Sequence, residues 1–135
     1  MKPTKHATTN FRMLKPFLDG LSGGTHRRYE DSGYMPLVVE ELSGTPGNKY
    51  TFSIAHYGYQ NGDAMRDPDM EVEVDFAAGT VDPLYFRNDY MGIEQNVYIY
   101  QNGKRLYSPR LRTDLDDFLW HWLKNIHDQG FAKAI

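Results

Sequence analysis

Strict alternation of apolar and polar residues is the clearest pattern in this chain. Residues 70–76 read MEVEVDF, and residues 49–57 alternate in the same way around Tyr50, Phe52 and Ile54. A period of two is typical of a β-strand with one buried and one wet face. Residues 37–42 (LVVEEL) and 84–86 (LYF) predict two further strands. The middle of the chain is therefore expected to form a sheet.

Residues 97–107 give the strongest local signal. Asn102 and Gly103 separate two short runs rich in tyrosine and aliphatic residues, and an Asn-Gly pair supplies the two positive-φ positions of a type I′ turn. This segment predicts a β-hairpin. Residues 43–48 and 77–80 have the composition of turns. Residues 22–34 have no periodicity and predict a surface loop.

Helical periodicity marks both ends of the chain. Apolar residues at positions 11, 14, 18 and 21 predict a short N-terminal helix that Pro16 should kink or shorten, with a cap at Thr8, Thr9 or Asn10. A longer stripe between positions 115 and 126 predicts a C-terminal helix. Thr113 and Asp116 resemble a capping box for its start, and Gly130 is placed to end it.

The order helix, five or six strands, helix predicts an α+β fold. We expect a mainly antiparallel five- to six-stranded sheet, with the N-terminal and C-terminal helices packed on one face. At 135 residues the chain predicts a single domain over residues 1–135, in which residues 1–10 form a flexible tail.

Composition removes several classes of function. The chain has no cysteine, which excludes disulfides and thiolate chemistry, and its formal net charge is −3, which gives no general reason to bind nucleic acid. No apolar run approaches the roughly 20 residues of a membrane span, and the N-terminus has no apolar signal region. These features predict a cytoplasmic protein with no membrane partner.

Residues 56–70 hold the main candidate for a binding site. They are expected to contain a polar, aromatic loop of about ten residues, longer than a plain hairpin needs. The candidate binding residues are His56, Tyr57, Tyr59, Gln60, Asn61, Asp63, Arg66, Asp67 and Asp69.

Two kinds of chemistry are open to this segment. His56 with Asp63 and Asp67 could serve a metal- or phosphate-dependent enzyme, or a nucleotide-binding site. Turn-forming carboxylates that cap backbone N–H groups explain the same residues. No known ligand spacing is matched and no nucleophile is in context, so no metal, cofactor or catalytic residue is assigned.

Surface side chains suggest partners. Basic residues at positions 26–28, 104, 105, 110 and 112 could contact phosphate or nucleic acid, against which the net charge argues. Tyr57, Tyr59, Tyr90, Tyr98, Tyr100 and Trp120 cannot all be buried in a core of this size. Tyrosine and tryptophan anchor protein interfaces, so a homodimer or a protein partner is favoured.

The pattern from Ser53 to Met70, with His-Tyr, Gln-Asn-Gly-Asp and Asp-Pro-acidic-Met, resembles a small bacterial and phage family catalogued as domain of unknown function 6908. The resemblance extends over about residues 33–131, including the closing Phe-Leu and Trp-Leu pairs of the C-terminal helix. The family carries no established activity, and its members are typical of plasmids, integrative elements and phages.

The resemblance implies a non-enzymatic accessory factor of a mobile genetic element or phage. Such a factor would bind a host or element protein, for example as an anti-defence inhibitor of a host system. The alternative is the metal- or phosphate-dependent enzyme centred on His56, Asp63 and Asp67.

Overall fold

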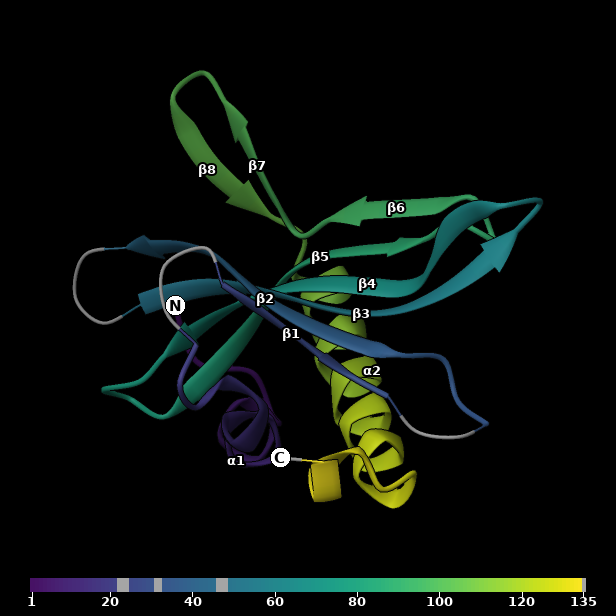
Figure 1. The fold of residues 1–135 in the computed structure, drawn as a ribbon. Helices are drawn as coiled ribbons and strands as arrows, with labels where there is room; N and C mark the ends of the chain where they lie inside the picture. The colour runs from purple at the N-terminus through teal and green to yellow at the C-terminus, as the bar shows by residue number, and fades with distance from the viewer. Residues whose placement is uncertain (22–24, 31–32, 46–48, 135) are drawn as a thin grey trace.

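The computed structural model describes residues 1–21, 25–30, 33–45 and 49–134 (Figure 1). Its elements, in order, are α1 (Ala7–Leu18), β1 (His26–Tyr29), β2 (Leu37–Thr45), β3 (Lys49–Gln60), β4 (Asp63–Asp75), β5 (Thr80–Asn88), β6 (Ile93–Asn96), β7 (Tyr98–Gln101), β8 (Lys104–Tyr107), α2 (Pro109–Asp128) and the 3₁₀ helix η1 (Phe131–Ala134). No helix in these described ranges is both long and apolar enough to cross a membrane.

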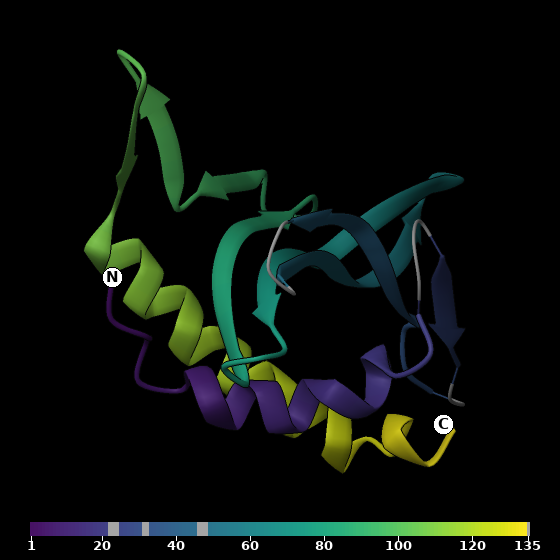
Figure 2. The same cartoon turned by 90° about the vertical axis from the view of Figure 1, so that its left-hand side faces the viewer.

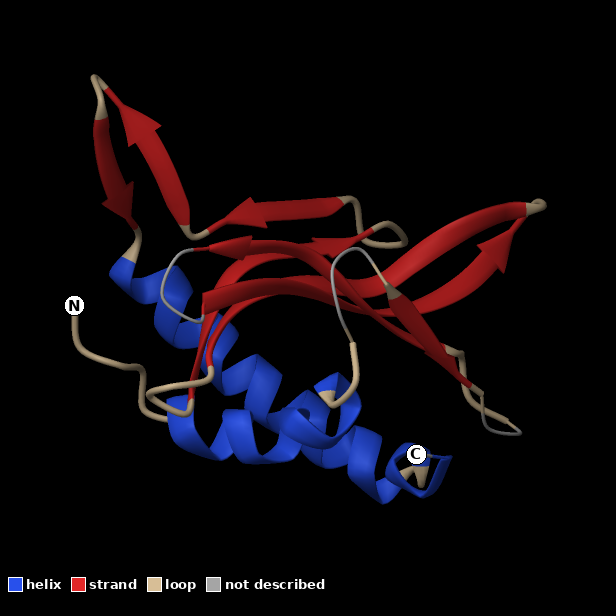
Figure 3. Cartoon of the chain, turned by 60° about the vertical axis from the view of Figure 1, so that its left-hand side comes forward, coloured by secondary structure: helices blue, strands red, loops and turns tan. Residues whose placement is uncertain are grey.

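Six strands form one antiparallel meander. They lie in the order β1-β2-β3-β4-β5-β6, so each strand pairs with the next along the chain. α1 and α2 lie on the same side of this curved sheet (Figure 3). β7 and β8 form a separate two-stranded hairpin that projects away from the body (Figure 2). The predicted α+β class, with a six-stranded sheet and both helices on one face, is confirmed.

The core lies between the sheet and the helices. Alternation on β3 and β4 directs every second side chain inward, and α1 and α2 cover them with their apolar stripes. The fully buried side chains include Phe52, Ile54, Met70 and Val72 from the sheet and Leu14, Phe17, Leu119, Leu123 and Ile126 from the helices. Burying each such side chain stabilises the fold by roughly 1.5–3 kcal/mol before entropy is counted.

β1 corrects the expectation that residues 22–34 form a loop. His26 pairs with Glu40 and Tyr29 with Leu37, so this segment forms an edge strand of the sheet. Of its four residues only Tyr29 is buried. An edge strand with one buried side chain shows no period of two, which is why the sequence pattern missed it. Residues 22–24 and 31–32 of the predicted loop lie outside the described residues.

The N-terminal helix begins earlier than its predicted caps. α1 starts at Ala7, with His6 at the cap position and no side-chain cap. Thr8, Thr9 and Asn10 are therefore inside the helix, whereas the sequence placed residues 1–10 in a flexible tail. Pro16 is accommodated in the last turns, and the helix ends at Leu18 just before Gly20, whose φ is 85°.

The C-terminal helix also begins earlier than predicted. Ser108 is its N-cap, its side chain accepts a hydrogen bond from the backbone N–H of Leu111, and Pro109 occupies the first turn. The predicted capping box at Thr113 is wrong, because Thr113 lies one turn inside α2 and donates to the Pro109 carbonyl at 3.0 Å. Gly130 has a φ of 90° just past the helix end, as expected.

The first half of the predicted turn at residues 43–48 belongs to a strand instead. Residues 43–45 continue β2, and residues 46–48 lie outside the described part of the chain. A register shift between Glu41 and Ser43 marks a bulge in β2 at the same point. A bulge leaves one extra residue unpaired and bends the strand, and pairing with β3 resumes from Ser43 to Thr45.

We expect Ser108→Ala to lower the free energy of unfolding by about 1 kcal/mol, because an N–H at the start of α2 loses its acceptor. Thr113→Ala, one turn inside the helix, should change it by less than about 0.5 kcal/mol. Urea denaturation measures both. An equal or larger loss for Thr113→Ala would return the start of the helix to the sequence-predicted position.

Candidate functional site

Residues 56–70 do not form the predicted ten-residue loop but the distal half of a long hairpin. β3 continues to Gln60, β4 begins at Asp63, and the turn consists of Asn61 and Gly62. Both turn residues have positive φ, 52° and 85°, as a type I′ turn requires. Strand pairing continues to the tip, with one register shift beyond Ala55. The polar residues of this segment are therefore strand residues with fixed directions.

Strand geometry divides the nine predicted binding residues among three places. Tyr57, Arg66 and Asp69 lie on the face of the sheet that points away from the helices, which we call the outer face and define by Ser53, Tyr57, Asp69 and Glu71. Tyr59, Gln60, Asn61 and Asp63 surround the exposed hairpin tip. His56 and Asp67 are held by other parts of the fold.

His56 has the contacts of a structural residue. Its Nδ1 lies 3.1 Å from the Met35 carbonyl and 3.3 Å from the Pro36 carbonyl, and its ring contacts Trp122 edge-on at 5.5 Å. Burial lowers the pKa of His56, against the opposing effects of the two carbonyls and the charge of Asp67. A neutral imidazole that donates its Nδ1–H to the backbone ties the chain before β2 to β3.

A metal or phosphate centre at His56, Asp63 and Asp67 is not assembled. Asp67 accepts a hydrogen bond from the amide of Asn88 at 2.8 Å. Asp63 lies beside the turn, four positions along an extended strand from Asp67, or about 13 Å at 3.3 Å per residue. Within the described residues, the one His/Asp/Glu group close enough to share an ion lies elsewhere.

Two adjacent carboxyl groups on the outer face have raised pKa values. Asp69 is 7% exposed and accepts a hydrogen bond from the Ser53 hydroxyl at 2.7 Å. Burial raises the pKa of Asp69, and the Ser53 hydrogen bond and the charges of Arg66 and Arg87 oppose this. Burial and then the charge of Asp69 raise the pKa of Glu71. These interactions all lie within the sheet, and the hydrogen bond from Ser53 to Asp69 joins β3 to β4.

Asp89 joins the distal half of the long hairpin to the β5–β6 connection. Its Oδ2 accepts from the backbone N–H of Arg66 at 2.8 Å and from Arg66 Nε at 3.2 Å, and its Oδ1 accepts from Arg87 Nε at 2.8 Å. The backbone hydrogen bond, then those of the two guanidinium groups, lower the pKa of Asp89 to about 2. Asp89 therefore works as an anionic clamp for this end of the sheet.

The hairpin of β7 and β8, which we call the arm (residues 98–107), is the most exposed element. Its turn residues Asn102 and Gly103 have φ of 52° and 75°, so the predicted type I′ hairpin is confirmed. Ile99 pairs with Leu106 on one face and is 53% exposed, while Tyr100 on the other face is 76% exposed. An apolar cross-strand pair thus faces away from the core.

The root of the arm is fixed by a polar network. Tyr98 donates its hydroxyl to Asp82, and Arg112 Nε donates to the same carboxylate at 2.7 Å. Burial, then the contact with Asp82, raises the pKa of Tyr98 to about 12. The Arg105 guanidinium lies 3.9 Å from the centre of the Tyr98 ring. A cavity of about 310 Å³ opens between this root and the N-terminal segment near Thr4.

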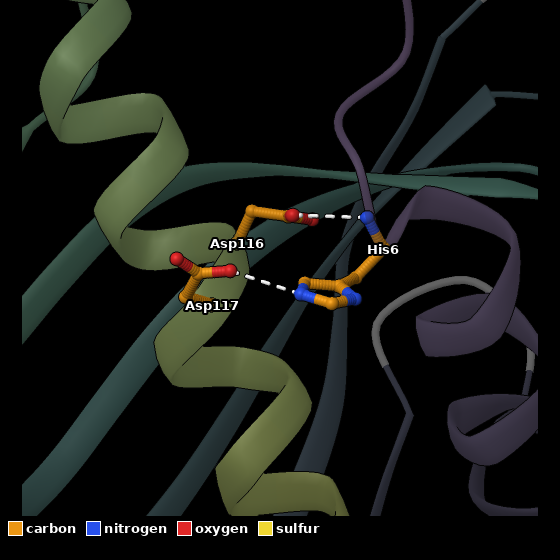
Figure 4. A group of neighbouring side chains, drawn as sticks. All are labelled: His6, Asp116 and Asp117. Carbon is orange, nitrogen blue, oxygen red and sulfur yellow. Dashed lines mark hydrogen bonds and ion pairs between the residues drawn. The ribbon is translucent and has the colours of Figure 1, made fainter.

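The group close enough to share an ion consists of His6, Asp116 and Asp117, drawn in Figure 4. His6 Nε2 lies 2.9 Å from Asp117 Oδ1, and the His6 backbone N–H donates to Asp116 Oδ2 at 3.0 Å. Thr4 donates its hydroxyl to Asp116 Oδ1 at 2.6 Å. This cluster fastens the N-terminal segment to α2. Sequence analysis did not find it, because its members are about 110 positions apart.

We expect Asp89→Asn to lower the free energy of unfolding at neutral pH by about 1–3 kcal/mol, because charged hydrogen bonds to two arginines lose their charge. Since folding lowers the pKa of Asp89 from 3.8 to about 2, this contribution is present above pH 3.8 and is lost as the pH falls toward 2. Urea denaturation at neutral and acidic pH measures the difference from wild type. Asp63→Asn, at the exposed tip, is the control. If the free energies of unfolding of Asp89→Asn and wild type differed by the same amount at neutral and at acidic pH, the proposed role of Asp89 as a clamp would be contradicted.

We expect His56→Ala to lower the free energy of unfolding by about 2 kcal/mol, because it removes a buried ring and its backbone hydrogen bonds. Since folding lowers the pKa of His56 below 6.5, the unfolded chain binds this proton first, and wild type loses stability as the pH falls below 6.5. His56→Ala should lose that part of the pH dependence. Unchanged thermal stability in the variant would restore His56 as a candidate for chemistry.

The chain matches one family model across most of its length. Residues 9–132 match the model of a family described as a domain of unknown function, DUF6908, and the match covers all eight strands and α2. A search of curated proteins and a search of solved structures each gave no match. The resemblance found in the sequence is thereby confirmed, and this chain belongs to the domain of unknown function 6908 family.

Proposed function

We propose that this protein acts by binding a protein partner through its arm. The observation that carries the proposal is the apolar pair of Ile99 and Leu106, paired across the arm and 53% and 42% exposed. Seven of the arm's eight strand residues are exposed. An isolated two-stranded hairpin is marginally stable in water, and exposed apolar side chains on one favour a binding surface.

The residue types on the opposite face of the arm support the same proposal. Tyr100 and Tyr107 are 76% and 42% exposed, and Arg105 lies between them on this face. Tyrosine and arginine are enriched among the residues that dominate binding energy in protein interfaces. Asn102 and Gly103 form a tight turn, so both faces of the arm are carried by one short pair of hydrogen-bonded strands.

Backbone groups offer a mode of binding. The arm forms a two-stranded sheet, and in the described chain neither β7 nor β8 pairs with a third strand. Outward N–H and C=O groups of such strands can accept an added strand from another protein. Main-chain hydrogen bonds would then supply affinity, while the Ile99 and Leu106 pair would supply a specific apolar contact.

The family resemblance suggests the kind of partner and the biological setting. A host or element protein is the proposed partner, and the proposed setting is a cytoplasmic accessory factor of a mobile genetic element or phage, with an anti-defence role. A second copy of the chain is another partner that the same surface could bind. A homodimer and a complex with a different protein have different masses in solution. Nucleic acid is disfavoured by the net charge of −3.

The test compares Ile99→Ser/Leu106→Ser with wild type. The double variant should lose about tenfold or more of its partner affinity, because two apolar contacts of about 1 kcal/mol or more each are removed. Tagged proteins expressed in the native host, with quantitative mass spectrometry of co-purified proteins and light scattering for dimers, measure this loss. Binding should then be reproduced with the purified partner.

Met91→Ser is the matched control, since Met91 is also apolar and 68% exposed but lies in the β5–β6 turn. It should keep the partner. Both variants should melt close to wild type, because neither changes the core. Retention of the partner by the double variant, or an equal loss in Met91→Ser, would contradict the proposal.

A further inference from the structure

We propose that the open edge of β1 binds an extended, acidic peptide segment of another protein, which would add to the sheet as a further strand. β1 stands at one end of the six-stranded sheet, whereas the arm follows β6 at the other end (Figure 2). This site is therefore separate from the arm. Three observations carry the proposal: the backbone groups at this edge, the charges beside them, and a hollow on the outer face next to β1.

The backbone of His26 and Arg28 points away from β2 at this edge. The Glu41 N–H donates to the Thr25 carbonyl at 3.1 Å, and the two strands then pair without a register shift. In an antiparallel ladder, every second residue of an edge strand turns its N–H and C=O groups toward the neighbouring strand. Thr25 and Arg27 therefore face β2, and the N–H and C=O groups of His26 and Arg28 face outward. An added strand needs such groups, and in the described chain β1 pairs with β2 alone.

The charge of β1 selects the kind of strand that can be added. Three of its four residues are His26, Arg27 and Arg28, and the strand has no acidic residue. His26 lies opposite Glu40 of β2, so Arg28 is the side chain to which we assign the contact. Its Nε donates to Glu30 at 2.5 Å, but both side chains are exposed, and such surface pairs contribute little to stability. A carboxylate of an added strand can share the guanidinium, whose fork offers several N–H donors.

The same charges argue against a second copy of this chain as the occupant. Antiparallel pairing of two β1 strands would place their basic residues side by side, and like charges on opposed strands destabilise a sheet. Charged residues at an open edge are a common protection against such self-pairing. They give no protection against a strand of opposite charge, so the edge favours an acidic partner.

A hollow on the outer face gives the site a second contact. It has a volume of about 300 Å³ and is lined by His26, Arg28, Val38, Tyr57, Tyr59 and Ala64. Tyr59 is 66% exposed and Tyr57 is half-buried. An added strand would lie about 4.8 Å from β1, so a long apolar or aromatic side chain can reach over Arg28 and contact the tyrosine rings. This contact gives a role to two tyrosines that the sequence placed among the candidate binding residues.

The test selects peptides that bind the full chain. A display library of random peptides is selected against wild type, and enriched sequences are measured as labelled synthetic peptides by fluorescence polarisation. We expect them to combine acidic residues with alternating aromatic or apolar residues. N-methylation of one of the two alternate sets of backbone amides should weaken binding by about tenfold or more, because those amides face β1, and methylation of the other set should weaken it less.

Matched substitutions in β1 separate the backbone contact from the side-chain contact. His26→Pro removes an outward N–H and leaves the groups that pair with β2, so it should weaken peptide binding by about tenfold or more. His26→Ala removes only the ring and should bind closer to wild type. Arg28→Glu should also weaken binding by about tenfold or more, whereas Arg110→Glu, whose side chain is 94% exposed on α2, should not. Thermal melting checks that each variant is folded.

The double variant Ile99→Ser/Leu106→Ser should bind the same peptides as wild type does, because the arm lies at the other end of the sheet. The absence of any enriched peptide, equal binding by Arg28→Glu and Arg110→Glu, or N-methylation without effect would overturn the proposal. A dimer in light scattering that His26→Pro disperses would also overturn it, because the edge would then belong to a second copy.

Discussion

Burial of one face of the β1–β6 sheet beneath α1 and α2 is the constraint on which the rest of this structure depends. Alternation along β3 and β4 creates a continuous apolar surface through residues such as Ile54, Met70 and Val72, which are fully buried. Because the meander is antiparallel, only that face needs cover. The outer face, the hairpin tip and the arm are then free to carry polar and aromatic residues.

The same constraint explains which elements the sequence predicts. Residues 70–76 and 115–126 lie against the core, so their periodicity of two and of 3.6 is complete. Residues 70–75 form the C-terminal half of β4, and residues 115–126 form the apolar stripe of α2. Asn102 and Gly103 predict the arm because a type I′ turn has local chemistry. By contrast, the tip of the β3–β4 hairpin, beyond the pair of Tyr57 and Arg66, extends past the helices. A strand with no buried face has no reason to alternate, so the segment looked like a loop.

The candidate sites were less predictable than the fold for a related reason. His56 lies two positions beyond the buried Ile54 and contacts Trp122 of α2, but the carbonyls of Met35 and Pro36 that bind it come from a different part of the chain. His6 and Asp116 touch across 110 positions, which no local pattern can pair. Ser108 followed by Pro109 is a readable helix start that the stripe beginning at Leu115 obscured. Contacts between distant segments therefore account for most of what sequence alone missed.

One side of the first turns of α2 links the arm to the N-terminal segment. Ser108, Arg112 and Asp116 are spaced by four residues and so lie along one side of the helix. Ser108 caps the helix directly after the arm, Arg112 binds Asp82 beneath Tyr98 at the arm's root, and Asp116 binds the N-terminal segment. The arm has no core of its own, so its orientation depends on this side of α2.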